Sequence, residues 1–411
     1  MKLGINSMGR IGKLTLWHHL ARRHFSELVV NVGRPVGTGL PDLVDALCKD
    51  TTYGQLGRFL HGHKGGLTIE ELNEESGRVI IDGMPIHFLR SERNPSRIGW
   101  RSHDVRLVVD CTGVFVDPVV AADAPAGSLR GHLEAGAEKV LLSAPFKIKD
   151  KGMGMPADAI TAIMGINEEA CHPGQHHLIS AASCTTTCLA FMMKPLLDHF
   201  GADNILSASM VTVHAATSSQ PVLDSVPTAG SRDLRKNRSI FNNIILTTTG
   251  AAKALSLVIP EMRHIGFMAE SVRIPVSTGS LIILTVNVQS EDAANPINRS
   301  QINAIFQQAA EGVYRDRLLY STSQNVSSDI IGTPKAAVVM ESQETHTRTA
   351  FSKVHLDRLA TIPPEVRQHL TQPTLEVPVT QVVLYGWYDN ELGSYTNALG
   401  DLTVHIAEEM I

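Results

Sequence analysis

A cysteine and a histidine near the middle of the chain have side chains suited to nucleophilic catalysis. Cys184 stands just before apolar residues that recur at helical spacing over residues 189–200. A thiol at a helix N-terminus is favoured as the nucleophilic thiolate. His214 follows the β-branched run 205–213, which places an imidazole at a strand end. The two suit an ion pair or a thiol with its general base, although a buried inert cysteine and a hydrogen-bonded histidine fit the same pattern.

Two kinds of pattern predict the elements that position this pair. Short aliphatic runs alternate with helical patterns in the first half, which is typical of a parallel sheet with right-handed crossovers. These runs are 3–6, 27–32, 106–110 and 139–143. Longer β-branched runs at 205–213 and 279–288 favour a mixed or antiparallel sheet. We therefore expect an α/β protein, with an N-terminal Rossmann-type doubly wound domain and an α+β catalytic domain that contains the mixed or antiparallel sheet.

Two later segments complete this outline. Residues 350–380 are rich in Pro, Thr and charge and are interpreted as an inserted helix with loops. The plainest expectation for this insertion is a surface or subunit-contact element. Apolar residues at helical spacing over 396–411 predict a final helix that packs back on an earlier domain.

The turn after the first strand has the composition of a dinucleotide-binding loop. Its residues are Asn6, Ser7, Met8, Gly9, Arg10, Ile11 and Gly12. The glycines of such a loop allow a tight turn and a close approach of the pyrophosphate, which then meets the N–H groups at the start of the next helix. Because Ser7 replaces the first glycine of the pattern, an ordinary strand-turn-helix fits the segment as well.

The end of the second strand bears on the choice of cofactor. Residues 31–34 include no acidic residue that could bind the adenosine ribose hydroxyls, and they end in Arg34. Without a carboxylate a 2′-phosphate is not repelled, and Arg34 could pair with it. We predict that NADP is accepted, alone or together with NAD. The alternative is that Arg34 is simply solvated in a turn.

The composition excludes several classes of protein. A formal net charge of −5 argues against a nucleic-acid binder, and no apolar stretch is long enough to span a membrane. The five cysteines do not form a secreted disulfide framework and the N-terminus lacks the apolar region of a signal peptide, so we expect a cytoplasmic protein. The densest histidine clusters, 61–63 and 171–177, lack a common zinc spacing. We interpret them as solvated loop histidines and expect no metal.

Seven short motifs occur in one order along the chain. They are residues 6–12, 111–115, 143–145, 164–167, 183–186, 249–254 and 387–391. In this order they resemble the glyceraldehyde-3-phosphate dehydrogenase family over nearly the whole chain. The resemblance implies a homotetramer whose cofactor-binding domain comprises residues 1–183 and the C-terminal helix 391–411. It implies a catalytic domain over 184–390, with the insertion near 350–380.

The resemblance also implies roles for single side chains in catalysis. Cys184 resembles the nucleophile of the family and His214 its acid/base partner. Thr217 and Arg273 resemble the pair that holds the phosphate already on the substrate. The site of the attacking inorganic phosphate is matched by Ser183, Thr185, Thr249 and Gly250, with a cation from either Arg235 or Lys236.

Further matches concern the cofactor. Asn390 resembles the residue that orients the nicotinamide carboxamide. The cofactor-lining positions are Asn6, Gly9, Arg10, Ile11, Gly12, Arg34, Thr112, Gly113 and Ser143. Residues 225–226 are Ser and Val where NAD-selective members of the family have Leu and Pro. The side chain of Ser225 is smaller than leucine and leaves room for a 2′-phosphate. This is a second, independent indication that NADP is accepted.

The activity implied by the resemblance is the oxidation of glyceraldehyde 3-phosphate with inorganic phosphate to 1,3-bisphosphoglycerate. Cys184 would add to the aldehyde, a hydride would pass to NAD or NADP, and phosphate would open the resulting thioester. One alternative is a non-phosphorylating dehydrogenase of another phosphorylated aldehyde, of the erythrose-4-phosphate type, with water as acceptor. A second is a catalytically weak regulatory paralogue. The sequence does not distinguish a glycolytic from a biosynthetic direction, or phosphate from arsenate.

Overall fold

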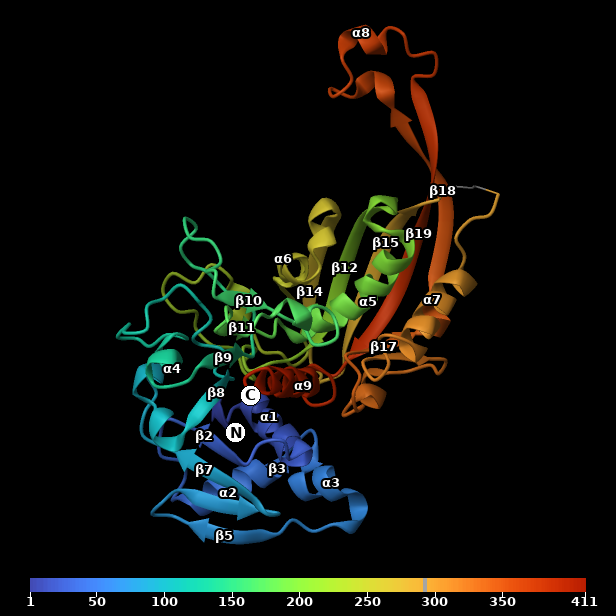
Figure 1. The fold of residues 1–411 in the computed structure, drawn as a ribbon. Coiled ribbons are helices and arrows are strands. Elements are labelled where there is room, and N and C mark those ends of the chain that lie inside the picture. The colour runs from blue at the N-terminus through green and yellow to red at the C-terminus, as the bar shows by residue number, and fades with distance from the viewer. Residues whose placement is uncertain (291–293) are drawn as a thin grey trace.

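The computed structural model describes residues 1–290 and 294–411, which form two large β-sheets with helices packed on them (Figure 1). The N-terminal sheet comprises β1 (Lys2–Asn6), β2 (Glu27–Asn31), β5 (Ile69–Asn73), β6 (Arg78–Ile81), β7 (Met84–Leu89), β8 (Val105–Asp110), β9 (Lys139–Leu142), β10 (Ala159–Thr161) and β11 (Leu178–Ser180). The associated helices are α1 (Arg10–Arg22), α2 (Leu40–Cys48), α3 (Leu56–His61) and α4 (Gly131–Glu134). A short hairpin of β3 (Lys49–Asp50) and β4 (Gly54–Gln55) lies apart from this sheet.

The N-terminal sheet is a doubly wound parallel sheet with an antiparallel edge. Its order is β10-β11-β9-β8-β1-β2-β7-β6-β5, and only the pairs that involve β6 are antiparallel. The four predicted runs of the first half are β1, β2, β8 and β9, each within a residue of its expected bounds. Leu3 and Ile5 on β1 are fully buried between helical layers. The predicted Rossmann-like architecture is therefore confirmed. In sheets of this kind ligands bind beyond the carboxyl ends of the strands where the strand order reverses, which here is between β1 and β8.

The C-terminal half forms the mixed sheet that the long β-branched runs predicted. Its strands are β12 (Ile205–Ala215), β13 (Ile245–Thr247), β14 (Gly266–Ile274), β15 (Ser280–Gln289), β16 (Leu318–Ser321), β17 (Val338–Glu341), β18 (His346–His355) and β19 (Thr374–Tyr388). The helices are α5 (Cys184–Phe200), α6 (Ala251–Val258), α7 (Arg299–Glu311), α8 (Pro364–Arg367) and α9 (Tyr395–Glu408). β12 pairs in parallel with β14 and antiparallel with β15, which in turn pairs antiparallel with β19.

Helix α5 lies on the core face of this sheet. Phe191 and Met192 of α5 are fully buried in the same cluster as Leu284 and Leu384 of the central strands. Gly386 on β19 permits this close packing, because a methyl group there would lie 2.5 Å from Sδ of Met192. The helix is thereby fixed with its first residue, Cys184, beside the strand ends.

The final helix returns to the first sheet. Arg22 of α1 donates to Asp401 of α9 at 2.6 Å and to the Asn397 side chain at 2.7 Å. The ring Nε2 of His18 lies 2.8 Å from the Leu392 carbonyl oxygen. These contacts bring α9 and the segment between β19 and α9, which contains Asn390, against helix α1 of the N-terminal half (Figure 1).

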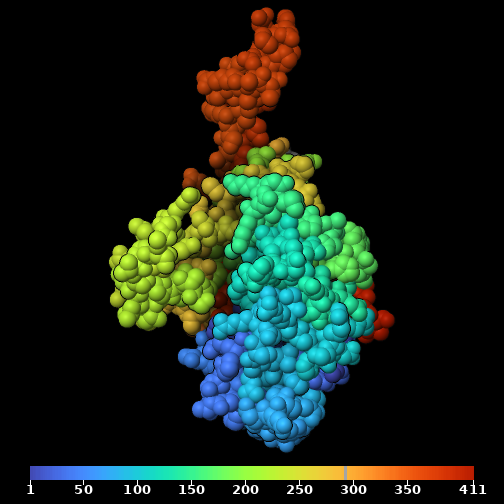
Figure 2. Space-filling model, turned by 90° about the vertical axis from the view of Figure 1, so that its left-hand side faces the viewer, coloured from blue at the N-terminus to red at the C-terminus, as the bar shows by residue number. Residues whose placement is uncertain are grey.

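The insertion near 350–380 is a β-arm, and the expectation of a helix with loops was wrong for most of it. β18 and the first part of β19 pair from His346 opposite Val383 to His355 opposite Thr374. Helical structure is confined to the tip, where a 3-10 turn (Leu356–Arg358) and α8 lie, and the arm projects far from the body (Figures 1 and 2). Both faces of this ribbon meet solvent, with Phe351 55% exposed, so its strands lack the apolar alternation that marks a half-buried strand.

Candidate active site

The N-terminus of α5 presents Cys184 at a sharp turn. Ser183 is the N-cap residue, and its hydroxyl accepts a hydrogen bond from the Thr186 N–H at 3.1 Å. The preceding Ala182 has a positive φ of 56°, a left-handed conformation that reverses the chain just before the helix. Tyr395 of α9 donates to the Ala182 carbonyl at 3.1 Å and holds this turn. Cys184 is therefore fixed from both sides, as a nucleophile requires.

The structure brings together three of the predicted residues. Sγ of Cys184 lies 3.6 Å from Nε2 of His214. The parallel register of β12 and β14 places Arg273 directly opposite His214. Nη1 of Arg273 lies 2.6 Å from Nδ1 of His214 and donates to the Ala215 carbonyl at 3.0 Å. A thiol, an imidazole and a guanidinium thus meet where α5 approaches the end of β12.

Burial sets the protonation of this trio. Burial lowers the pKa of His214 to about 4, and the neighbouring Arg273 cation lowers it as well. Burial also raises the pKa of the Cys184 thiol, against the opposing effect of Arg273 and of N–H groups at the helix start. Both pKa shifts favour a neutral thiol beside a neutral imidazole in the protein without substrate. The helix N-terminus alone predicted a lowered thiol pKa, and the burial that outweighs it is not visible in the sequence.

This protonation predicts how the reactivity of Cys184 depends on pH. Because the thiolate is the reactive form and the thiol pKa is raised, alkylation by iodoacetamide should rise about tenfold per unit between pH 7 and pH 9. His214 is neutral throughout this range and should add no inflection near pH 6.5. The measurement is the rate of labelling of the Cys184 peptide by mass spectrometry. A plateau between pH 6 and pH 8 would instead indicate a preformed thiolate–imidazolium pair.

Three of the residues matched to phosphate binding lie on the loop after β12 and at the start of α6. Thr217 follows β12, and its N–H and hydroxyl both donate to Oε1 of Gln220 at 3.0 Å. Thr249 accepts from the Ala251 N–H at 3.2 Å, and Gly250 is the N-cap residue of α6. Thr249 and Gly250 therefore lie at the start of α6, where the first N–H groups have no partner within the helix itself.

Four side chains are expected near the attacking phosphate, two with hydroxyl groups and two with positive charges. The Ser183 hydroxyl caps α5, and the Thr185 hydroxyl lies 3.0 Å from the Tyr388 hydroxyl in the interior. Arg235 pairs with Asp233 at 2.8 Å on an exposed turn, and Lys236 is exposed beside it. Within residues 1–290 and 294–411 no hydrogen bond or ion pair links either cation to the trio. The choice between them stays open.

The turn after β1 is shaped to admit a phosphate group. A methyl group on Gly12 would lie 2.0 Å from the Ser7 carbonyl oxygen, so only glycine permits this turn. Helix α1 starts after Gly9 without a side-chain cap, which leaves its first N–H groups for an external acceptor. These features fit the pyrophosphate of a dinucleotide. Met8 and Ile11 pack on the core beneath the turn.

Ser7 has the backbone conformation of the glycine it replaces. Its φ is 110°, and its hydroxyl accepts from the Gly9 N–H at 3.0 Å. We expect Ser7→Gly to relieve the strain and raise the free energy of unfolding by about 0.5–1 kcal/mol, because the relief exceeds the entropic cost of glycine. Urea denaturation without cofactor measures this change. Ser7→Ala, which keeps the strain and loses the hydrogen bond, is the control; a less stable Ser7→Gly would contradict the argument.

A buried carboxylate that the sequence analysis missed organises this turn. Asp110 at the end of β8 accepts from the Asn6 side chain at 2.8 Å and from the N–H and hydroxyl of Thr112 at 3.0 and 2.7 Å. His132 lies 3.0 Å away and takes its other ring contact from Trp100. Asn6 in turn accepts from Asn31 at 2.8 Å. Asp110 therefore holds Asn6 and Thr112 in place at the carboxyl ends of β1 and β8. The one signal of this role in the sequence is an acidic residue at the end of a predicted buried strand.

The other positions matched to the cofactor lie in α1 or on turns that follow β2, β8 and β9. Arg10 is ion-paired with Asp50 and Glu391, so its side chain ties α1 to the segment that precedes α9. Ser143 follows β9 and donates its N–H to the Asp110 carbonyl at 2.9 Å. Gly113 has a positive φ of 64° and is exposed, as is Arg34. A hollow of about 550 Å³ lies beyond the ends of β2 and β7, lined by residues 35–39, 74–77 and 87–91.

Asn390, matched to the nicotinamide-orienting position, follows the end of β19. It is buried, and its Oδ1 accepts from the Ser280 hydroxyl at 3.0 Å, while the Thr278 hydroxyl oxygen lies 3.1 Å away. The neighbouring Asp389 accepts from the hydroxyls of Tyr53 and Thr278, both at 2.7 Å. The motif 387–391 pointed to Asn390, whereas nothing in the sequence singled out its hydroxyl partners.

Comparison with known proteins shows the family to which the chain belongs. The family model described as "Glyceraldehyde 3-phosphate dehydrogenase, NAD binding domain" matches residues 1–118, and the one described as "Glyceraldehyde 3-phosphate dehydrogenase, C-terminal domain" matches residues 183–357. The chain belongs to the glyceraldehyde 3-phosphate dehydrogenase family. Glyceraldehyde-3-phosphate dehydrogenase 2 of Streptomyces avermitilis is 34% identical over 417 aligned positions, with 100% of this chain and 99% of the relative covered. Glyceraldehyde-3-phosphate dehydrogenase of Geobacillus stearothermophilus is 32% identical with the same coverage.

Membership of the glyceraldehyde 3-phosphate dehydrogenase family makes the chain a dehydrogenase with a domain for a nicotinamide cofactor and a phosphorylated aldehyde as substrate class.

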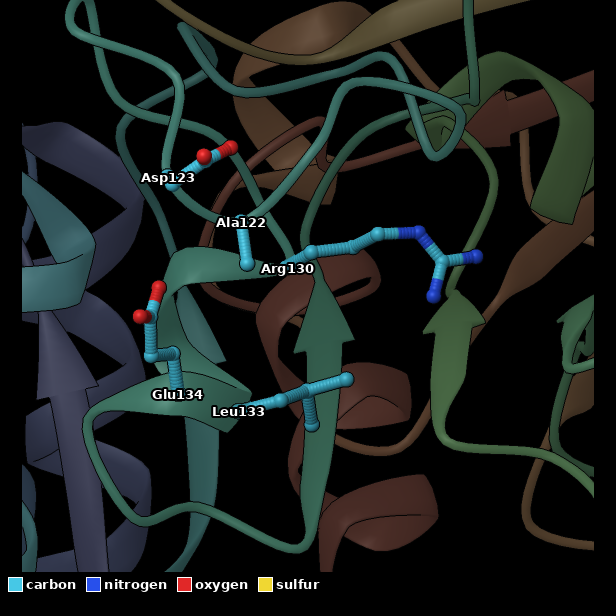
Figure 3. A pocket seen from close by; sticks show the side chains of 5 residues that line it. All are labelled: Ala122, Asp123, Arg130, Leu133 and Glu134. Atoms are coloured by element: carbon cyan, nitrogen blue, oxygen red, sulfur yellow. The ribbon is translucent and has the colours of Figure 1, made fainter.

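The surface hollow of about 460 Å³ in Figure 3 contains none of the residues of the candidate active site. There the Arg130 side chain extends away from Asp123 and Glu134 and pairs with Asp158 at 2.7 Å. In the part of the chain that the structure describes, no helix is long and apolar enough to cross a membrane.

Proposed function

We propose that this chain oxidises glyceraldehyde 3-phosphate to 1,3-bisphosphoglycerate with inorganic phosphate. The observation that carries the proposal is the contact of Cys184, His214 and Arg273 at 3.6 and 2.6 Å. Addition of the thiol forms a carbon–sulfur bond at the aldehyde as the carbonyl π bond opens. The thiol proton passes by way of Nε2 of His214 to the aldehyde oxygen, which becomes the hydroxyl of the adduct and leaves the imidazole neutral again. Arg273 is the proposed partner of the phosphate already on the substrate.

His214 and Arg273 act on the later steps as well. A bound nicotinamide supplies the acceptor for the hydride. His214 takes the hydroxyl proton of the adduct as the hydride leaves, which gives a thioester on Cys184. Inorganic phosphate then attacks the thioester carbon, and Cys184 leaves as the thiolate. The proposed site for that phosphate comprises Ser183, Thr185, Thr249 and Gly250, with Arg235 or Lys236.

Binding of the substrate phosphate would also change the electrostatics of the trio. Arg273 lowers the pKa of His214 while its charge is uncompensated. An anion paired with Arg273 reduces this effect, so the imidazole becomes a stronger base when the correct substrate is bound.

The proposed catalytic domain is 184–390, and the proposed cofactor domain is 1–183 with 391–411.

NADP is the proposed cofactor, with NAD accepted as well. The support is an exposed Arg34 after β2 and the absence of an acidic residue in 31–34. The proposed cofactor residues are Asn6, Gly9, Arg10, Ile11, Gly12, Arg34, Thr112, Gly113, Ser143 and Asn390.

A steady-state assay with NAD and NADP, each with and without phosphate, tests this function. We expect turnover of glyceraldehyde 3-phosphate to require phosphate and NADP to give at least comparable kcat/KM to NAD. A rate independent of phosphate would favour the erythrose-4-phosphate type of reaction with water as acceptor. A strong preference for NAD would show that Arg34 does not bind a 2′-phosphate.

A homotetramer is the proposed assembly. The loop after β12, residues 216–244, stands out from the body in Figure 2 and carries exposed apolar side chains, including Leu223 at 76% and Val226 at 89% exposed. Apolar surface of this kind is typical of subunit contacts. Light scattering at micromolar concentration should give about four chain masses, whereas a single chain mass would contradict the proposal.

A further inference from the structure

A buried serine lies between the proposed nicotinamide-orienting residue and the strand end that holds the imidazole. Ser280, the first residue of β15, is fully buried. Its Oγ accepts from the Ala215 N–H at 3.0 Å and donates to Oδ1 of Asn390 at 3.0 Å. One hydroxyl thus joins the residue that follows His214 to Asn390.

We propose that Ser280 is a positioning residue that fixes the amide of Asn390 so that its NH₂ group faces the carboxamide oxygen of the nicotinamide. The proposal rests on the proposed function, and it concerns which end of one side-chain amide is presented to the cofactor. Neither the motifs of the sequence nor the family comparison assigns a role to Ser280.

The hydrogen-bond inventory of Ser280 determines this orientation. The Ala215 N–H can only donate, so Ser280 Oγ is its acceptor and the hydroxyl proton needs an acceptor of its own. Oδ1 of Asn390 is that acceptor. If the amide turned round, its NH₂ would face Ser280 and the buried hydroxyl proton would lose its acceptor. An unmade hydrogen bond of a buried polar group costs about 1–3 kcal/mol, enough to hold one orientation.

The second hydroxyl near Asn390 cannot replace Ser280. Thr278 lies 3.1 Å from Oδ1 of Asn390, but it also lies 2.7 Å from the carboxylate of Asp389. Thr278 has a single hydroxyl proton, and the shorter contact to a charged acceptor is the stronger one. Ser280 is therefore the donor that decides the orientation of the amide.

The opposite end of the amide is free to bind. Within the described residues, Nδ2 of Asn390 has no hydrogen-bond partner, and it is not among the buried side-chain atoms that lack one. Nδ2 is therefore an accessible donor. Its position is fixed because Oδ1 of the same amide is held by the buried Ser280 hydroxyl. Asn390 lies on the segment that meets the N-terminal sheet, since Leu392 accepts from His18 and Tyr53 contacts Asp389.

Binding of cofactors that differ only at the carboxamide tests the proposal without an activity assay. Sulfur accepts hydrogen bonds more weakly than oxygen, so a thionicotinamide dinucleotide reports whether a donor faces this position. Calorimetry would give dissociation constants of NADP and thionicotinamide-NADP, and of the matching NAD pair, for wild type, Ser280→Ala and Ser290→Ala. Ser290 follows the far end of β15, is buried, and lies 2.8 Å from the Thr380 hydroxyl, which makes it a matched control.

We expect the wild type and Ser290→Ala to prefer the oxygen form by severalfold. Ser280→Ala should bind the oxygen form about tenfold more weakly and lose the preference over sulfur, with a melting temperature close to that of Ser290→Ala. If Ser280→Ala still preferred the oxygen form over the sulfur form, the proposed role of Ser280 would be overturned, while the proposed cofactor function would stand. A wild type that binds none of the four dinucleotides would overturn the proposed cofactor function, and this inference with it.

Discussion

Cys184→Ser should lower kcat for the phosphorylated aldehyde at least about 10³-fold and leave the fold intact. Serine keeps the size of the side chain, but its hydroxyl is a far weaker nucleophile than a thiol beside an imidazole 3.6 Å away. Since Cys184 is half-buried at the first turn of α5, the exchange removes little packing. Steady-state kinetics measures the loss, and thermal unfolding measures the stability.

A matched control lies one turn further along the same helix. Cys188 is fully buried, with its Sγ 3.9 Å from the Gly386 carbonyl oxygen, and has no contact with His214. Cys188→Ala should lower stability by about 1 kcal/mol through lost packing and retain most of the activity. Substantial turnover by Cys184→Ser, or equal losses in the two variants, would contradict a nucleophilic role for Cys184.

The second large effect is expected for His214→Asn. We expect kcat to fall by about 10²–10⁴-fold, because asparagine fills a similar volume and cannot accept the thiol proton. The KM for the aldehyde should change little, since Arg273 and Thr217 are proposed to hold its phosphate. Kinetics from pH 6 to pH 10 would show the residual activity of the variant rising with pH, as hydroxide and a free thiolate replace the base.

A control histidine is available away from the site. His61 is partly exposed and paired with Asp82 at 2.6 Å. His61→Asn should leave kcat within about twofold of wild type. If His214→Asn raised KM strongly with kcat unchanged, His214 would be a binding residue and the account of the trio would be wrong.

The sequence predicted the architecture and the central pair because both depend on local patterns. Aliphatic runs ended in polar residues at the carboxyl edge of the sheet, and the helical period after Cys184 placed it at a helix start. The contact between Arg273 and His214 depends on the parallel register of β12 and β14, which no spacing reveals. The family resemblance supplied Arg273, and the register explains how it reaches the imidazole.

Other features depend on burial and on long-range contacts and were missed. Asp110, Ser280 and Thr278 act through hydrogen bonds to residues far away in the sequence, so their neighbours in the chain give no signal. The raised pKa of Cys184 likewise follows from the packed surroundings of the thiol. The β-arm was mistaken for a helix with loops because a ribbon exposed on both faces has no hydrophobic period.

Mass analysis of the protein after a single turnover without phosphate tests the central claim most directly. With aldehyde and oxidised cofactor present and no acceptor for the thioester, we expect about one reduced nicotinamide per chain and an acyl group on the peptide that contains Cys184. Addition of phosphate should release that group. An acyl group on another residue, or reduction of cofactor with no covalent adduct, would contradict the account.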